Sequence, residues 1–242
     1  MKILALETSA TACSVALCED ERLLAQNFEH CGLTHSRTLM PMLEGMLDMA
    51  GVPLSEVDVI AMAAGPGSFT GLRIGVSAAK GLAWPGDKPC AGVSTLEAMA
   101  WTVAHTGLEV CSVMDARRHQ VYNGRFVLAP DGKSLLRLAP DRAIALSDLA
   151  EELKKEGKTQ ILVGDGADLC YTTLKEQGLD VVLAPPHLRN QTAWGVARCA
   201  LEQARTGQLT DARGLTPSYH RLSQAERERL AREQAAQAAK PK

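Results

Sequence analysis

Apolar and polar positions alternate along this chain in blocks that predict strands and helices in turn. Three short apolar runs separated by polar bends open the chain, as in an antiparallel meander. From residue 34 apolar positions recur every three or four residues, which predicts a helix that ends at Gly51 and Pro53. The first block is expected to contain strands at 2–7, 13–18, 22–29, 57–63 and 90–93, and helices at 36–50, 70–84 and 94–104.

The second half of the chain repeats this order. Asp115 follows the apolar run CSVM much as Glu7 follows ILAL, and a three-strand pattern comes next in both halves. Helix and strand patterns then alternate, with helices expected at 147–156, up to about 177, and at 192–206. Two such halves predict a duplicated α/β fold. The expected organisation is a first lobe over 1–104, a second lobe over 105–222 and a helical tail over 223–242.

A glycine-rich loop, GPGS, joins the strand at 57–63 to the helix at 70–84. Gly65 and Gly67 are expected to turn with positive φ, and Ser68 or Thr70 to cap the helix. A strand, such a loop and a helix N-terminus can together hold an anion. A tight connection with a good cap explains the same residues, and we give that interpretation more weight.

Composition excludes several classes of protein. Of the 242 residues, 46% are hydrophobic and 22% charged, which is typical of a globular protein, and the net charge of −2 gives no overall attraction to nucleic acid. No apolar run reaches the length of about 20 residues that a membrane helix needs. The seven cysteines include no C-x-x-C pair, so no disulfide framework or zinc ribbon is expected. We predict a cytoplasmic protein with no membrane association.

The histidines do not form a recognisable catalytic or metal-binding pattern. His30 and His35 are five residues apart, which does not bring two rings to one helix face. No H-x-x-x-H or G-x-S-x-G motif occurs, so neither a metal site nor a hydrolase is predicted.

Six segments in order resemble the TsaB (YeaZ) family, a branch of the acetate kinase, sugar kinase, Hsp70 and actin superfamily with its RNase H-like fold. They are LALETSATACSVAL, THSRTLMPMLEGML, AAGPGSFTGLRIGVSAAKGLAW, VSTLEAMA, MDARRHQVYNGRF and TPSYHRLSQAE. The resemblance implies a duplicated actin-like ATPase fold. It also implies a non-catalytic paralogue of TsaD, the subunit that transfers a threonylcarbamoyl group to the adenosine 3′ of the anticodon in tRNA.

One departure from the catalytic paralogue is informative. TsaD carries a helical H-x-E-G-H whose two histidines bind metal, and VSTLEAMA stands at the equivalent place. Glu97 is retained, but Thr95 and Met99 occupy the histidine positions. A hydroxyl and a thioether do not replace two imidazoles, so Met99 is interpreted as a core residue and no metal is expected.

The resemblance implies that two helices pair with two helices of TsaD, or of a second copy, as a four-helix bundle. The first helix has a methionine-rich stripe, and methionine adapts to different partner surfaces. The second repeats small residues at four-residue spacing. The residues expected at this interface are Leu39, Met42, Met46, Met49, Gly71, Gly75, Ala78, Ala79 and Leu82. The alternative is that both stripes face the chain's own sheet, since each helix must bury one face and only part of either stripe can be exposed.

The resemblance also implies a degenerate nucleotide site. The first hairpin, with Glu7, Thr8 and Ser9, would hold phosphates, and the turn with Gly164 and Gly166 would lie near adenosine. Kinases of this fold usually have an aspartate where this chain has Glu7. No cofactor is therefore expected, and ATP or ADP is restricted to the interface with the catalytic partner.

The expected partners are TsaD, the ATPase TsaE in a larger complex, TsaC in the same pathway, and tRNA through the complex. Basic groups at 117–119 and at Arg221, Arg227, Arg229 and Arg232 are candidates for tRNA contact, although solvation or pairing with glutamates explains them better. Two alternatives stay open: a stand-alone ATPase or kinase of the same fold, and a metallopeptidase-like enzyme.

Overall fold

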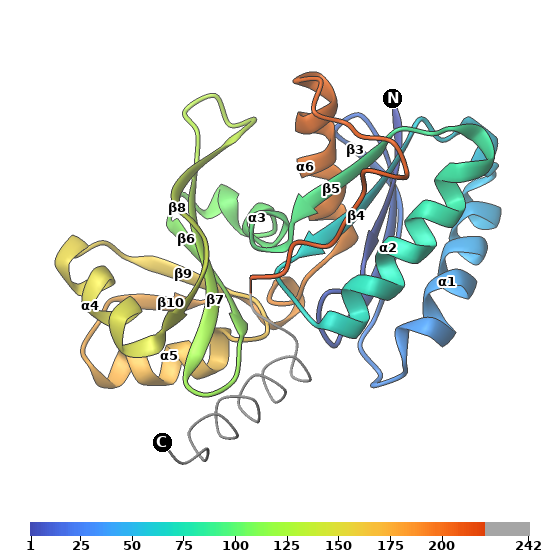
Figure 1. Ribbon diagram of the computed structural model, residues 1–242. Helices are drawn as coiled ribbons and strands as arrows, with labels where there is room; N and C mark the ends of the chain where they lie inside the picture. Colours follow the sequence, from blue (N-terminus) through green and yellow to red (C-terminus); the bar gives the residue numbers. More distant parts are fainter. Residues whose placement is uncertain (221–242) are drawn as a thin grey trace, which may run out of the picture.

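The computed structural model describes residues 1–220, which form two α/β lobes side by side (Figure 1). The predicted tail at 223–242 and the four arginines from 221 onward lie outside the described residues. Each lobe is built on a five-stranded mixed sheet. The first sheet contains β1 (Lys2–Glu7), β2 (Cys13–Glu19), β3 (Arg22–Glu29), β4 (Val59–Gly65) and β5 (Cys90–Ser94). The second contains β6 (Glu109–Asp115), β7 (Gln120–Leu128), β8 (Leu135–Ala145), β9 (Gln160–Val163) and β10 (Val181–Leu183).

The two sheets have the same topology. The first runs in the order β3-β2-β1-β4-β5, and the second runs β8-β7-β6-β9-β10. In each, the three meander strands pair antiparallel and the next two join in parallel, with β1 beside β4 and β6 beside β9. The duplication predicted from the sequence pattern is therefore confirmed strand by strand.

Helices cover the sheets. They are α1 (His35–Ala50), α2 (Phe69–Ala83), α3 (Thr95–Trp101), α4 (Leu146–Glu156), α5 (Ala167–Glu176) and α6 (Ala193–Arg205). Short 3-10 turns lie at η1 (Leu54–Glu56), η2 (Trp84–Gly86), η3 (Ala104–Thr106) and η4 (Pro186–Leu188). The third helix is shorter than expected, since α3 ends at Trp101 and η3 follows it. None of the helices in the described part is long and apolar enough to span a bilayer.

Alternation along β1 assigns the helices to the two faces of the first sheet. Leu4 and Leu6 pack with residues of α1 and α2, whereas Ile3 and Ala5 point to the opposite face and pack with α6. Figure 1 shows α1 and α2 together on the outer side of this sheet. They run in the same direction, because β3 and β4 both end at the same edge of the sheet.

The expected lobe boundary between residues 104 and 105 separates the two sheets but places α6 in the wrong lobe. This helix was expected in the second lobe, yet it packs against β1, β2, β4 and β5 of the first. The segment after α6 also returns to the first sheet, where Thr210 and Cys90 exchange backbone hydrogen bonds of 2.9 and 2.7 Å. The first lobe is therefore discontinuous in sequence, because α6 buries its apolar stripe against a sheet formed about 100 residues earlier.

Candidate functional site

The two parts of the predicted nucleotide site lie in the β1–β2 hairpin of the first lobe and in the turn after β9 of the second. Glu7, Thr8 and Ser9 are buried at the start of the hairpin. Gly164 packs on the carbonyl of Val113 at the end of β6, where a Cβ would lie 2.0 Å from the oxygen. The charge of Asp165 in this turn reaches the carboxyl of Glu7, so the structure brings the two parts of the predicted site near each other.

The loop that precedes α2 packs against this hairpin. The backbone N–H of Ser68 donates to the carbonyl of Ser9 at 2.7 Å, and the Thr8 hydroxyl donates to the carbonyl of Gly71 at 2.8 Å. Ser68 caps α2 as expected, with its Oγ accepting from the N–H of Gly71 at 3.3 Å. The Thr8 hydroxyl is therefore engaged with α2 and the Ser9 carbonyl with the residue that caps it, whereas the buried Ser9 hydroxyl makes no hydrogen bond to this helix.

Close approach, rather than backbone conformation, explains most of the glycines here. Gly65 has the expected positive φ of +134°, and its peptide bond to Pro66 is cis. Gly67 does not have a positive φ; it is needed because a Cβ there would lie 2.5 Å from the Ser9 carbonyl oxygen. A Cβ on Gly71 would lie 2.0 Å from the carbonyl oxygen of Thr8. The glycines of this stretch let α2 approach the first hairpin.

The carboxyl of Glu7 is the main titratable group at the hairpin. Burial raises the pKa of Glu7 to about 7, although a hydrogen bond from the N–H of Ser9 at 2.6 Å opposes the shift. Burial also raises the pKa of Asp165, which accepts from the side chain of Gln191 at 2.9 Å. The charge of Asp165 adds to the shift at Glu7, so these two carboxyl groups from opposite lobes lie close enough to interact electrostatically.

Apolar residues continue this contact between the lobes. Ala10 at the hairpin tip packs against an apolar cluster that contains Leu96 and Met99 of α3 and Met114 of β6. Met99 is completely buried, as the core interpretation expected, and so is Thr95. Within residues 1–220 no group of three or more His, Cys, Asp or Glu side chains is arranged to hold a metal ion.

Glu97 belongs to an ion-pair network instead. Arg137 of β8 bridges Glu97 and Asp141, and the Ser94 hydroxyl donates to the same aspartate. The guanidinium of Arg137 also lies 4.6 Å from the centre of the Phe126 ring. This network fastens the long strand β8 of the second lobe to the N-terminus of α3.

The burial of the predicted interface residues divides them into two groups. Five of the nine are buried within the chain and expose no surface to a partner: Leu39, Met46, Gly71, Gly75 and Ala79. For these five the burial does not fit a place at an interface, because both helices turn them toward the sheet and the Thr8 hairpin. Met42 packs partly on the core beside β3, with its carbonyl accepting from Asn27 at 3.1 Å, and Met49 is 78% exposed. Ala78 and Leu82 are half-buried.

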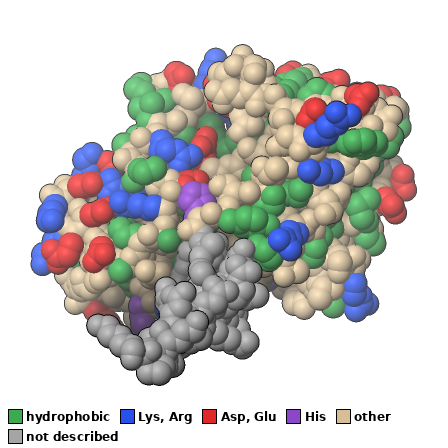
Figure 2. Space-filling model, viewed as in Figure 1, with side chains coloured by type: hydrophobic (Ala, Val, Ile, Leu, Met, Phe, Trp, Pro, Cys, Tyr) green, Lys and Arg blue, Asp and Glu red, His purple; other side chains and the backbone are tan. Residues whose placement is uncertain are grey.

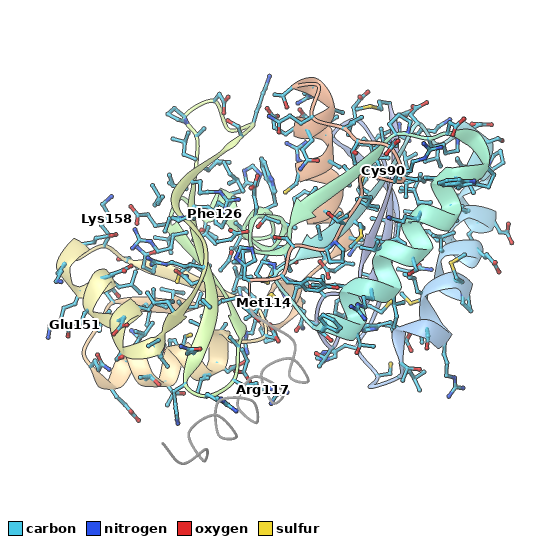
Figure 3. The ribbon with its side chains drawn as sticks, viewed as in Figure 1. Cys90, Met114, Arg117, Phe126, Glu151 and Lys158 are labelled. Carbon is cyan, nitrogen blue, oxygen red and sulfur yellow. The ribbon has the colours of Figure 1, made fainter. Side chains whose placement is uncertain are left out.

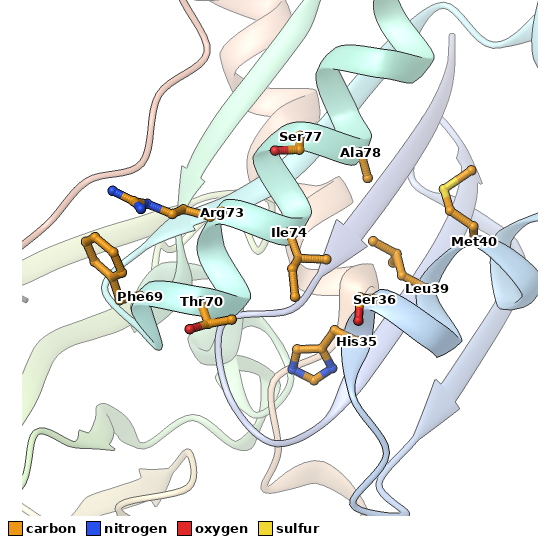
Figure 4. A pocket seen from close by; sticks show the side chains of 10 residues that line it. All are labelled: His35, Ser36, Leu39, Met40, Phe69, Thr70, Arg73, Ile74, Ser77 and Ala78. Atoms are coloured by element: carbon orange, nitrogen blue, oxygen red, sulfur yellow. The ribbon is translucent and has the colours of Figure 1, made fainter.

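An apolar groove of about 580 Å³ lies between α1 and α2 (Figure 4). Met40 and Leu39 line one side, and Ile74 and Ala78 line the other. The helical period of the sequence predicted one buried stripe on each helix but did not identify Met40 and Ile74 as residues that line a groove. The four-residue repeat of Ser36, Met40 and Glu44, which lies outside the buried stripe of α1, was the signal that could have found Met40.

A basic hairpin tip lies apart from this groove. Residues Arg117, Arg118 and His119, between β6 and β7, all have positive φ, from 56° to 64°. The carboxylate of Asp115 accepts from the N–H of Arg117 at 2.7 Å and pairs with its guanidinium at 3.8 Å. Figure 3 shows Arg117 far from Phe126 in the second-lobe core, and Figure 2 shows basic and acidic side chains interspersed over that lobe.

The same strand order in two five-stranded sheets defines a duplicated, two-lobed α/β protein with the actin-like ATPase fold. Comparison with known proteins narrows the class. The family model of tRNA N6-adenosine threonylcarbamoyltransferase, TsaD, matches residues 29–227. The TsaB protein of Bacillus subtilis, named for tRNA threonylcarbamoyladenosine biosynthesis, is 33% identical over 93% of this chain and 96% of its own length. The chain belongs to the TsaB (YeaZ) family.

Other relatives support the same family assignment. The TsaB protein of Escherichia coli is 42% identical over 50% of this chain and 53% of its own length. The crystal structure of YeaZ from Pseudomonas aeruginosa superposes with a TM-score of 0.75 at 30% identity, covering 90% of this chain and 99% of that one. A second Pseudomonas aeruginosa structure, described as similar to the peptidase YeaZ, gives a TM-score of 0.79.

Proposed function

We propose that this chain acts in the biosynthesis of threonylcarbamoyladenosine in tRNA as a non-catalytic scaffold subunit. Its role would be to bind and stabilise the catalytic subunit TsaD, which transfers the threonylcarbamoyl group to the adenosine 3′ of the anticodon. The names of the relatives support the pathway, and the match to the TsaD family model supports descent from a common ancestor with that enzyme.

The observation that carries the scaffold role is the exposed groove between α1 and α2. Each helix buries part of its small or methionine stripe internally, yet Met40, Ile74 and Ala78 still line an open apolar groove. Apolar side chains along two neighbouring helices fit a helix pair of another subunit. A stable interface of this kind covers roughly 1,200–2,000 Å² in total.

The residues between the lobes support a role other than independent catalysis. The Thr8 hydroxyl is hydrogen-bonded to α2, and Met99 and Thr95 are buried where the catalytic paralogue has metal-binding histidines. Glu97 is paired with Arg137. We propose that ATP or ADP binds only at the interface with TsaD, and that this chain contacts TsaE and tRNA only as part of the assembled complex. TsaC acts in the same cytoplasmic pathway, and the chain alone forms a homodimer.

Reconstitution tests the proposal directly. Threonylcarbamoyladenosine formation on tRNA is measured with TsaD, TsaE and TsaC, in the presence and absence of this chain. The scaffold role predicts strong dependence on the chain, with no activity from the chain alone. Equal modification without the chain contradicts the proposal, as does tight binding of labelled ATP by the isolated chain.

Charged substitutions in the groove test the docking face. Met40→Glu and Ala78→Glu place a carboxylate on partly exposed apolar positions, so the fold is retained while co-purification with TsaD is lost. Leu169→Glu is the matched control, because Leu169 is 43% exposed on α5 of the other lobe. Retention of the complex by both groove variants contradicts the assignment of this face.

A further inference from the structure

The hairpin of β7 and β8 belongs to the second sheet, but its outer end contacts the first lobe. Figure 1 shows the hairpin extending past α3, on the side where α6 stands. Leu128 and Leu135 are paired in the ladder of this hairpin, and both pack against the apolar cluster that joins α6 to the first sheet. The guanidinium of Arg198 on α6 donates to the carbonyl of Lys133 at 3.4 Å. Apolar and polar contacts therefore fasten the end of the hairpin to α6.

The turn at this end is held by hydrogen bonds of its own. The Asp131 carboxylate accepts from the backbone N–H of Lys133 at 2.9 Å and from that of Ser134 at 3.3 Å. The N–H of Ala129 donates to the carbonyl of Ser134 at 2.9 Å, and Gly132 takes the left-handed φ of +67° that the turn needs. The hairpin therefore keeps its shape up to the point where it meets α6.

A second contact joins β8 to the junction of β5 and α3. The hydroxyl of Ser94, the last residue of β5, donates to Asp141, and Arg137 bridges Asp141 to Glu97 in the first turn of α3. The N–H of Glu97 donates to the Oγ of Ser94 at 3.1 Å, so Ser94 caps α3 and contacts β8 at once. The side chain of Asp141 is only 13% exposed, so water and salt screen this contact weakly.

The duplicated fold shows that this length is an addition. The equivalent hairpin of the first lobe has strands β2 and β3 of seven and eight residues. In the second lobe β7 and β8 have nine and eleven residues. Leu135 and Arg137, near the outer end of β8, contact α6 and α3. The part of the hairpin that has no counterpart in the first lobe is therefore the part that connects the two lobes.

Groups buried between the lobes oppose the closed arrangement. Burial raises the pKa of Glu7 to about 7, and the charge of Asp165 from the second lobe raises it further. One carboxyl oxygen of Glu7 and the amide oxygen of Gln191 are buried without a hydrogen-bond partner within residues 1–220. Such groups cost free energy, which is recovered when water reaches them. At this place the chain would gain free energy if the lobes moved apart.

We propose that the outer part of the β7–β8 hairpin is a clasp that holds the two lobes closed, and that its release lets them swing apart. Within residues 1–220 the chain passes between the lobes before β6 and before α6, so a hinge motion is available to it. The inference goes beyond the proposed binding of TsaD, because it concerns the geometry of this chain alone. The clasp consists of Leu128, Lys133, Leu135, Arg137 and Asp141.

The distance between the lobes can be measured on the full chain. Cys31 in the first lobe is exposed, whereas the other six cysteines are buried. Lys155→Cys adds a second reactive thiol at the exposed end of α4 in the second lobe. Spin labels on the two thiols give the distribution of their separation by double electron–electron resonance. Labelled chain is diluted into an excess of unlabelled chain, so that only distances within one chain contribute.

The clasp variant combines Leu135→Ser with Arg137→Met, which removes an apolar and an ionic contact between the lobes. The matched control combines Ile144→Ser with Arg142→Met on the same strand. Ile144 packs on the core of the second lobe and Arg142 pairs with Glu152 of α4, so the control makes the same changes within one lobe. Arg137→Met alone and Arg142→Met alone form a milder pair, and circular dichroism checks that each chain is folded.

The unchanged chain and the control should each give one narrow distribution of distances. The clasp variant should give a broader distribution, with a second population displaced by more than about 2 Å, as in hinge rearrangements of domains. Arg137→Met alone should show a smaller fraction of that population.

Three outcomes overturn the proposal: an unchanged chain that already samples both populations, a clasp variant whose distribution matches that of the unchanged chain, or a control that broadens as much as the clasp variant. None of these outcomes bears on binding to TsaD, which is measured separately by co-purification.

Discussion

Adding one methyl group at Gly71 is predicted to destabilise the fold strongly. A Cβ at this position would lie 2.0 Å from the carbonyl oxygen of Thr8 and 3.2 Å from its carbonyl carbon. Both are backbone atoms of the hairpin between β1 and β2, and the Thr8 hydroxyl is bound to the carbonyl of Gly71 itself. The clash therefore cannot be relieved by rotating a side chain, and α2 must move away from the first sheet.

The magnitude follows from two opposing effects. Alanine in place of a helical glycine gains about 1 kcal/mol of helix propensity. Overpacking a tight site costs about 1–3 kcal/mol and more where backbone must shift. At a contact more than 1 Å too short we expect the second effect to dominate, with a net loss of about 2–3 kcal/mol for Gly71→Ala. Gly81→Ala on the same helix meets open space and should gain about 0.5–1 kcal/mol.

Urea unfolding followed by circular dichroism measures both variants. The protein is kept dilute, so that self-association does not contribute to stability. The midpoint should fall for Gly71→Ala and rise for Gly81→Ala, with equal slopes in a two-state transition. If the Gly71→Ala variant is as stable as the unchanged chain, the inference that α2 closely contacts the Thr8 hairpin is refuted. Gly71 would then be free for the partner surface that its four-residue spacing predicts.

Three further predictions concern the contacts between the lobes. Burial raises the pKa of Glu7 from 4.5 to about 7, so the folded chain binds this proton more tightly than the unfolded chain. The free energy of unfolding should therefore fall by up to about 3 kcal/mol as pH rises from about 4.5 to 7. Glu7→Gln should flatten this pH dependence in urea unfolding at several pH values, and an unchanged pH dependence would contradict the assignment. Arg137→Met removes the bridge between Glu97 and Asp141 and should lower the free energy of unfolding by about 1–2 kcal/mol. Thermal unfolding measures this loss, with Lys133→Met as the exposed control. An equal loss of stability in both variants would argue against the network. Thr95→His with Met99→His places two rings in a fully buried core and should destabilise the chain without conferring zinc binding, so stoichiometric zinc in the purified variant would refute the core interpretation.

Much of the fold was predictable because it depends on local pattern. Short apolar runs in β1 and β2 and the helical period of α1 indicated their elements, and the repeated order indicated the duplicated lobes. The placement of α6 was not predictable in this way. Its amphipathic stripe indicates that one face is buried, but carries no information about which sheet buries it, and α6 packs on strands formed long before it in the chain.

The candidate site, like the fold, was predictable from the sequence only in part. The sequence by itself determined that α1 and α2 are helices rich in methionine and small residues, and that Glu7 and Asp115 follow equivalent strands. Only the tertiary structure decided that Gly71 and Gly75 face the hairpin, that Met46 is buried and that Met40 and Ile74 line the groove. The physical reason is that a helix needs its small residues wherever backbone comes closest, and that approach is set by Thr8, more than sixty residues away in the sequence.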